Sequence, residues 1–141
     1  SIPFTLKAAE EKYGIDKSIC TFTIPLGATI NMDGTAIMQG CATFFLASLY
    51  GIDLGINEIL TIVITATIAS IGTAGIPSAG IIMLTVIFTQ IGIPLEGITL
   101  LLGVDRLLDM MRTSVNVSGD LCISCVIASS ENKIDEKVFN S

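Results

Sequence analysis

The stretch that decides the fold is Gly103–Leu121, which reads GVDRLLDMMRTSVNVSGDL. Its chemically active side chains are spaced by four, three, four and four residues, and they are Asp105, Asp109, Arg112, Asn116 and Asp120. At about 100° per residue in a helix, all five fall within one arc of about 80°. Most of the flanking positions are Leu, Met or Val. The pattern predicts an apolar helix that carries a single charged stripe.

The composition places this stripe in lipid rather than in water. Hydrophobic residues make up 51% of the chain and charged residues 14%, and the mean hydropathy is +0.79. Between Lys17 and Asp53 the only charge is Asp33, and between Glu58 and Glu96 there is none. Both intervals exceed the roughly 20 residues that cross a bilayer core. We therefore expect a multi-pass membrane protein whose buried ionisable groups mark a substrate or ion path.

Nucleic-acid binding and structural zinc are not predicted. The net charge is −6, and no basic patch is interleaved with aromatic residues. Two of the four cysteines form Cys122-x-x-Cys125, but the chain has no histidine and no second pair near them. Because zinc needs four ligands, we interpret the cysteines as small apolar residues between helices, without a disulfide framework. The chain begins at Ser1 without Met or a signal peptide, and we expect a fragment of a longer protein.

Residues 18–50 are long enough to span a membrane but are interrupted in the middle. The interruption, Gly27–Thr35, reads GATINMDGT, and its Gly, Thr, Asn and Asp residues favour a turn over a helix. A helix broken at mid-depth leaves backbone carbonyls that protein or a bound ion must satisfy. With a carboxylate nearby, this arrangement is typical of Na⁺ coordination in transporters. The simpler alternative is a kinked structural helix with one buried Asp.

Residues 58–93 are predicted to form a re-entrant helical hairpin. They are interrupted by SIGTAGIPSAG at 70–80, whose glycines and Pro77 cannot continue a helix. Each arm is too short to cross the bilayer alone, so we expect both to enter and leave on one side. Small residues at the tip let the backbone approach a ligand closely. A plain tight turn between two packed helices is the alternative.

The remaining segments complete an all-α organisation. Residues 1–17 are predicted to be the end of a helix and a loop, 98–130 the last transmembrane helix, and 131–141 a charged cytoplasmic tail. The long helix exceeds the bilayer, so we expect it to tilt or to loosen near Asn116–Gly119. Lysines precede the first span and follow the last but are absent from the links between spans. The positive-inside rule therefore places both ends in the cytoplasm.

Three motifs together resemble the dicarboxylate/amino acid:cation symporter family, the glutamate and aspartate transporters. They are NMDGTA at Asn31–Ala36, SIGTAGIPSAG at Ser70–Gly80 and DMMRTSVNVSGD at Asp109–Asp120. The resemblance runs from about Pro3 to the C-terminus. It implies the C-terminal part of a transport domain, with residues 1–17 ending a first re-entrant hairpin. It also implies an elevator-like movement against lipid in the plasma or inner membrane, and a homotrimer assembled through the missing N-terminal part.

The resemblance further implies a binding site for an acidic amino acid. Arg112 would hold the side-chain carboxylate of the substrate, for which a planar guanidinium is suited. Asp109 would hold the α-ammonium, and Asp105 would keep Arg112 in place. The other implied substrate contacts come from side chains or backbone groups of Thr35, Thr113, Asn116, Ile76 and Gly80.

Three sodium sites made of oxygen ligands are implied in the same way, with Na⁺ as the coupling ion. Asp120 would anchor the first site, Ser70–Thr73 of the hairpin the second, and Asp33 the third. Because the hairpin supplies ligands only when it is shut, ion binding and gate closure would be coupled. The implied ligands, by carboxylate, amide or backbone carbonyl, are Gly27, Thr29, Asn31, Asp33, Ser70, Ile71, Thr73, Asn116 and Asp120.

These residues predict sodium-coupled symport of glutamate or aspartate. By the resemblance, Arg112 argues against a neutral amino acid, Asp109 against a plain C4-dicarboxylate, and Asp120 for Na⁺ over protons. Gln39 stands where animal members have a Glu linked to proton and potassium coupling, so we expect neither here. The alternative is a proton-coupled glutamate or C4-dicarboxylate symporter of the same family. No enzyme is expected: an intramembrane aspartyl protease needs Gly-x-Gly-Asp, and Val117–Asp120 reads VSGD.

Overall fold

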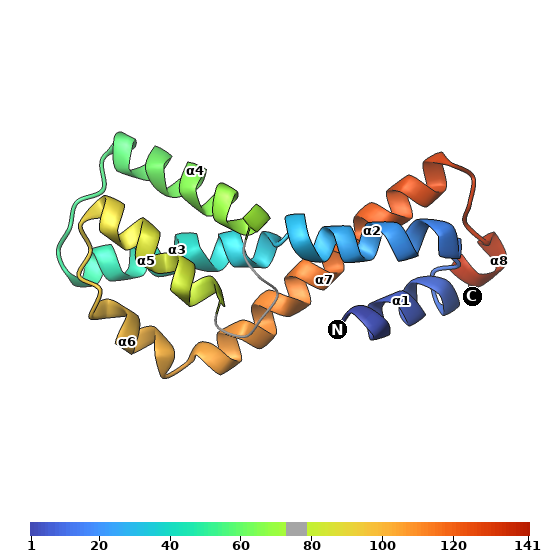
Figure 1. Cartoon of the computed structure of the whole chain (residues 1–141), viewed down its shortest axis with the longest axis horizontal. Helices are drawn as coiled ribbons and strands as arrows, with labels where there is room; N and C mark the ends of the chain where they lie inside the picture. Colours follow the sequence, from blue (N-terminus) through green and yellow to red (C-terminus); the bar gives the residue numbers. More distant parts are fainter. Residues whose placement is uncertain (73–78) are drawn as a thin grey trace.

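The computed structural model describes residues 1–72 and 79–141, which form eight α-helices. In chain order these are α1 (Ile2–Glu11), α2 (Lys17–Ile30), α3 (Asp33–Leu49), α4 (Ile56–Gly72), α5 (Ala79–Ile91), α6 (Gly97–Leu102), α7 (Asp105–Ser130) and α8 (Glu136–Phe139). Figure 1 shows an elongated molecule in which α2 and α3 lie nearly end to end and α7 crosses them. No strand occurs in the described ranges, which confirms the all-α prediction.

Local sequence explains where the first helices begin and end. Pro3 lies in the first turn of α1, where its missing N–H leaves no helical hydrogen bond unmade. Gly14 follows α1 with a φ of 66°, a conformation that glycine adopts without strain. Asp16 caps α2 by accepting a hydrogen bond from the backbone N–H of Ser18 at 2.9 Å. The Ser18 hydroxyl, and then this N–H, hold the pKa of Asp16 below its usual value.

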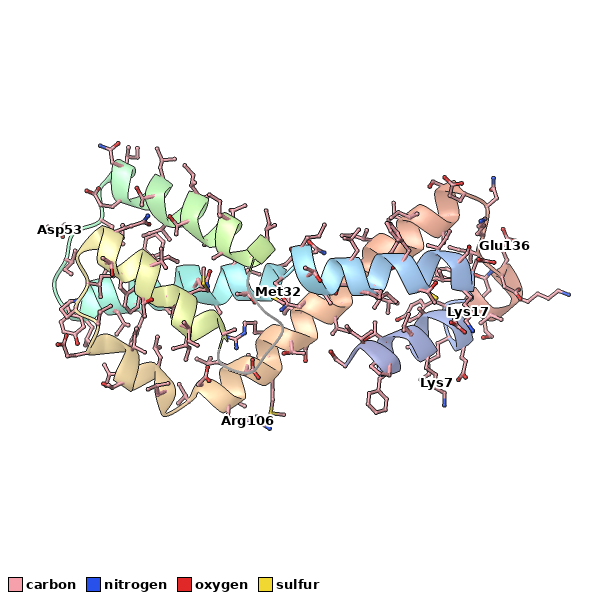
Figure 2. All side chains as sticks on the ribbon, in the orientation of Figure 1. Lys7, Lys17, Met32, Asp53, Arg106 and Glu136 are labelled. Atoms are coloured by element: carbon pink, nitrogen blue, oxygen red, sulfur yellow. The ribbon has the colours of Figure 1, made fainter. Side chains whose placement is uncertain are left out.

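The interruption predicted in residues 18–50 is present. Helix α2 ends at Ile30 and α3 begins at Asp33, so Asn31 and Met32 form a break between them. Met32 precedes α3 without a side-chain cap, because its thioether is a poor acceptor for the first N–H groups. Figure 2 places Met32 near the middle of the molecule, with Lys7, Lys17 and Glu136 towards one end. The break therefore lies at the centre of the fold.

Helices α4 and α5 form the two arms of the predicted hairpin, and they pack against each other. Thr65 Oγ1 of α4 donates a hydrogen bond to Gln90 Oε1 of α5 at 2.8 Å. The tip of the hairpin, with the predicted site residues Thr73 and Ile76, lies outside the described residues. The end of α4 approaches the break between α2 and α3 (Figure 1), and α4 contacts α2.

The expectation of one continuous helix over residues 98–130 is wrong. The structure divides this segment into α6 and α7, separated by Gly103 and Val104. Leu101 is buried in the same apolar cluster as Leu46 and Ile93, so α6 stays with that cluster while α7 turns away. The loosening expected near Asn116–Gly119 is also not observed, because α7 runs through these residues without interruption.

Two apolar clusters lie on either side of the helix break. The larger cluster joins α3, α4, α5 and α6, and its largest fully buried side chain is Phe88. The smaller cluster joins α1, α2 and the end of α7 around Ile24 and Ala128. No helix in residues 1–72 and 79–141 combines the length and the apolar character that a membrane crossing requires.

Candidate functional site

Arg112 lies in the first half of α7 and is only 6% exposed. Its Nη2 donates to Oδ1 of Asp109, one turn earlier on the same helix, and the two side chains form an ion pair. Its Nη1 is also buried and has no hydrogen-bond partner among the described residues. A buried guanidinium with unused donors is a strong binding group for a carboxylate.

Gly80, at the start of α5, lies directly against this guanidinium. A Cβ atom at residue 80 would stand 2.8 Å from Arg112 Nη1 and 3.2 Å from Cζ, so a larger residue would displace the guanidinium from this position. The Gly80 carbonyl also accepts a hydrogen bond from Nε2 of Gln39, at 3.2 Å. Gln39 belongs to α3 and is completely buried. Helices α3, α5 and α7 therefore meet at Arg112.

Asn116, one turn beyond Arg112, connects α7 to the start of α3. Its Oδ1 accepts a hydrogen bond from the backbone N–H of Gly34 at 2.7 Å. Its Nδ2 donates to the hydroxyl of Thr35 at 3.4 Å. The first N–H groups of a helix have no partner within the helix, and Asn116 supplies one from a distant segment. The amide therefore serves as the missing cap of α3.

Asp120, a further turn along α7, faces the end of α2. Its Oδ1 accepts a hydrogen bond from Asn31 Nδ2 at 3.3 Å. A Cβ at Gly27 would stand 2.3 Å from the same oxygen, so glycine is required for α2 to come this close. Likewise, a Cβ at Gly119 would stand 2.9 Å from Asp33 Oδ2. Two carboxylates thus flank the helix break, which is an arrangement suited to a cation.

The structure brings most of the predicted site residues together and leaves others apart. Ser70 and Ile71 lie at the end of α4, and Thr29 is exposed near the end of α2. Thr113 is exposed on α7, outside the contacts described above. Asp105 is buried at the first residue of α7. The residues gathered around the break and Arg112 are Gly27, Asn31, Asp33, Thr35, Gly80, Asp109, Asn116 and Asp120.

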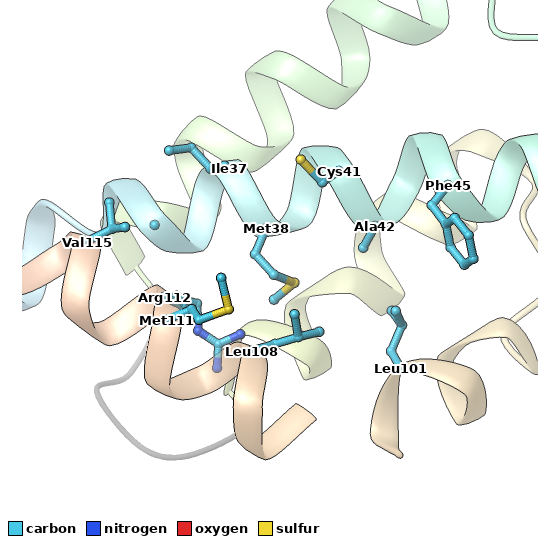
Figure 3. Close-up of a pocket in the computed structure, with 11 residues that line it drawn as sticks. Ile37, Met38, Cys41, Ala42, Phe45, Leu101, Leu108, Met111, Arg112 and Val115 are labelled. Carbon is cyan, nitrogen blue, oxygen red and sulfur yellow. The ribbon is translucent and has the colours of Figure 1, made fainter. Parts of the chain in front are cut away.

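Two features of the site were not predicted from the sequence. The first is the hydrogen bond from Gln39 to Gly80, which ties α3 to the hairpin. The second is a cavity of about 380 Å³ beside Arg112, between α3, α6 and α7 (Figure 3). Apart from Arg112, its walls are almost wholly apolar, and Ile37, Cys41 and Phe45 contribute from one face of α3. Their four-residue spacing was the available signal, but it is also the spacing of an ordinary packed helix.

Comparison with known proteins identifies the family. The model of the sodium:dicarboxylate symporter family matches residues 1–130, and the chain belongs to this family. Over 120 residues, the chain is 52% identical to excitatory amino acid transporter 3 of Mus musculus, 51% to excitatory amino acid transporter 2 of Homo sapiens and 49% to excitatory amino acid transporter 1 of Rattus norvegicus. The resemblance seen in the three motifs is thus confirmed.

These matches cover only part of each relative. They include 85% of this chain but 23%, 21% and 22% of the respective relatives, so the chain spans less than a quarter of their length. By name, the family and these relatives are transporters rather than enzymes.

Proposed function

We propose that this chain is part of a secondary transporter that carries glutamate or aspartate into the cell together with Na⁺. The chain forms the substrate-binding part of a domain that moves across the membrane. Its relatives named as excitatory amino acid transporters support the choice of substrate, and the family description supports Na⁺ as the coupling ion. The proposal extends both statements to a chain that spans less than a quarter of those proteins.

The observation that carries this proposal is the buried Arg112, whose Nη1 has no hydrogen-bond partner in residues 1–72 and 79–141. The side-chain carboxylate of the substrate binds this guanidinium, which lies against Gly80 at the start of α5. Asp109, already paired with Arg112, provides the negative charge for the α-ammonium group. A substrate with one carboxylate to pair with Arg112 and one ammonium to pair with Asp109 satisfies both charges. In this proposal Thr35, Thr113 and Asn116 add hydrogen bonds to the substrate.

Na⁺ binds beside the break, where carboxylates and backbone carbonyls of α2, α3 and α7 converge. Asp120 and Asp33 supply the negative charge, and the Asn31 amide holds the Asp120 carboxylate in place. Oxygen ligands of this kind suit a hard cation. The proposed ligand set also includes carbonyls of Gly27, Thr29, Asn116, Ser70 and Ile71.

Coupling follows from the position of the hairpin. Gly80 of its α5 arm contacts Arg112, the residue proposed to bind the substrate, and its α4 arm ends near the α2–α3 break (Figure 1). Closure of the hairpin completes both binding places at once, so each ligand favours the closed state that the other needs. Gln39 cannot titrate, so no proton is carried at that position.

We also propose where the chain lies in the cell and how it assembles. Residues 18–50, the hairpin and residues 98–130 lie within the plasma or inner membrane in contact with lipid, and residues 131–141 lie in the cytoplasm. Three copies associate through regions outside this chain, and each copy moves its transport domain past that fixed scaffold.

Uptake by the full-length protein tests the function. Aspartate uptake is expected to be lost when choline replaces Na⁺ at fixed pH. Arg112→Ala is expected to reduce aspartate uptake at least about 30-fold. Arg106→Ala is the matched control, because Arg106 is exposed at the start of the same helix and points away from the molecule (Figure 2). Surface expression is measured for each variant. Uptake that is indifferent to both Na⁺ and Arg112 would refute the proposal, and succinate uptake driven by protons would favour the alternative symporter.

A further inference from the structure

A pair of hydroxyl groups, one buried and one half-buried, lies one helical turn from Asp120. Ser124 of α7 is completely buried, and its Oγ donates to the backbone carbonyl of Asp120 at 2.8 Å. The same Oγ lies 2.7 Å from Oγ1 of Thr23 on α2, a residue 101 positions away in the chain. Because Ser124 uses its single proton on the Asp120 carbonyl, Thr23 is the donor in the contact between the two hydroxyls, and the Ile19 carbonyl at 2.9 Å is its alternative acceptor. The pair therefore links α2 to α7 through a continuous set of polar contacts inside an apolar cluster.

The pair repeats the register of the Asp120 contact. Gly27 faces Asp120, and one turn away along both antiparallel helices Thr23 faces Ser124. In an antiparallel pair of helices, moving back four residues on one helix and forward four on the other reaches the next point of contact. The Thr23–Ser124 contact and the Gly27–Asp120 contact are thus successive points on one interface. A shift at the first changes the position of the second.

The arrangement is sensitive to small displacements. The Asp120 carboxylate is so close to α2 that no atom larger than hydrogen fits at the side-chain position of Gly27. On the other side of this contact, Asn31 reaches the carboxylate at 3.3 Å, which is near the limit of a hydrogen bond. The apolar contacts around Ile24 and Ala128 have no directional preference, whereas a hydrogen bond between two hydroxyls does. The hydroxyl pair therefore adds a directional restraint on the register of the two helices.

We propose that Ser124 and Thr23 are positioning residues for cation binding at Asp120. They set the register of α2 against α7 and thereby the place of the Asp120 carboxylate relative to the helix break. This inference rests on the proposed function, since it assumes that Asp120 binds the coupling cation. Neither hydroxyl touches the cation or the substrate. The pair acts on Na⁺ affinity, while binding at Arg112, twelve positions before Ser124, is unaffected once Na⁺ is saturating.

The test is direct Na⁺ binding to the purified full-length protein without amino acid substrate. The Na⁺ dependence of the unfolding temperature reports the dissociation constant, because a ligand that binds only the folded state stabilises it by RT ln(1 + [Na⁺]/Kd). Thr23→Val, which keeps the shape of the side chain, and Ser124→Ala are each expected to weaken Na⁺ binding about 3- to 10-fold, the usual range for one buried hydrogen bond. Aspartate affinity at saturating Na⁺ is expected to stay as in the wild type.

Controls separate positioning from general damage. Thr23→Ser retains the hydroxyl and is expected to keep wild-type Na⁺ affinity. Ser118→Ala removes the same kind of bond, from Ser118 Oγ to the Ser114 carbonyl at 2.8 Å, from an exposed position of α7, and is expected to change nothing. The Thr23→Val/Ser124→Ala double variant is expected to be no weaker than the worse single variant, because both remove the same contact.

Each outcome decides the proposal. If the wild type binds Na⁺ and both hydroxyl-free variants bind it equally well, the positioning role is wrong and the proposed transport function stands. Additive losses in the double variant also overturn it, because they show two independent effects. If either variant fails to fold, the other still gives the Na⁺ measurement. If the wild type itself does not bind Na⁺, the positioning role and the proposed function fall together.

Discussion

Two helix breaks in the described residues, at Asn31–Met32 and at Gly103–Val104, are stabilised in different ways. At the first break, hydrogen bonds come from a distant helix. Asn116 accepts from the Gly34 N–H at 2.7 Å, and Asn31 donates to Asp120 at 3.3 Å. The partners in these two contacts are 82 and 89 positions apart in the sequence. Side chains of α7 therefore fix the geometry of this break.

At the second break, the backbone hydrogen bonds are made within the local turn. The Val104 N–H bonds the Leu101 carbonyl at 3.1 Å, and the Val104 carbonyl accepts from the next turn of α7. Leu102 and Val104 are 55% and 50% exposed. At the first break the Gly34 N–H depends on a side chain from a distant helix, and this is where we propose the cation site. A break whose backbone is satisfied locally only changes the direction of the chain.

The largest predicted effect is at the first break, in Gly34→Ala. A Cβ at this position would stand 2.4 Å from the backbone carbonyl of Arg112, which cannot move without displacing α7. We expect destabilisation at the upper end of about 1–3 kcal/mol, measured by thermal unfolding of the full-length protein, together with loss of aspartate binding. Gly40→Ala on the same helix is the control, because nothing lies within 4 Å of its added Cβ. An unfolding temperature equal to that of the wild type in Gly34→Ala would show that α3 and α7 are not held this closely.

An intermediate effect is expected for Asn116→Ala. The substitution leaves the Gly34 N–H without its acceptor, which costs about 1–3 kcal/mol for a buried group. Thr35→Val removes only the longer contact, at 3.4 Å, and should cost less. Chemical unfolding of both variants, with and without Na⁺, measures the difference. Equal losses in the two variants would mean that the cap of α3 is not what stabilises the first break.

The smallest effect is expected at the second break, in Gly103→Ala. Gly103 has α-helical dihedral angles, φ −64° and ψ −26°, and the nearest atom to an added Cβ is the Leu100 carbonyl at 3.8 Å. Alanine favours helix over glycine by up to about 1 kcal/mol, so we expect unchanged or slightly increased stability. Binding of Na⁺ and aspartate, measured by titration, should match the wild type. A clear loss of affinity would show that the second break also contributes to binding.

The two breaks also differ in whether the sequence predicted them. The first break was predictable because several Gly, Thr, Asn and Asp residues fall within one short segment and favour turns. The second was missed because Gly103 is a single glycine in an otherwise helical pattern, and its backbone is itself helical. The burial of Leu101 with Leu46 and Ile93 bends the chain there, and such burial is not encoded in the local pattern.

The candidate site was predicted to a similar extent. Periodicity alone placed Asp109, Arg112, Asn116 and Asp120 on one face of a helix. In the structure all four lie on α7, with Asn116 and Asp120 at the break and Arg112 against Gly80. The family resemblance added the residues of α2, α3 and the hairpin. Neither indicated that Gly80 touches the guanidinium or that Asn116 caps α3, because these contacts depend on the approach of separate helices. Thr113 is exposed in the structure, and its substrate contact stays a prediction.

The sequence by itself determined the helical content, the central break and the charged stripe, since each depends on neighbours within a turn or two. It also carried the three motifs that identify the family. Only the tertiary structure decided that α6 and α7 are separate helices, that Gly80 lies against Arg112 and that Thr23 meets Ser124. The physical reason is that these features arise where helices far apart in the chain pack together, and close packing selects one register among many that the local pattern allows.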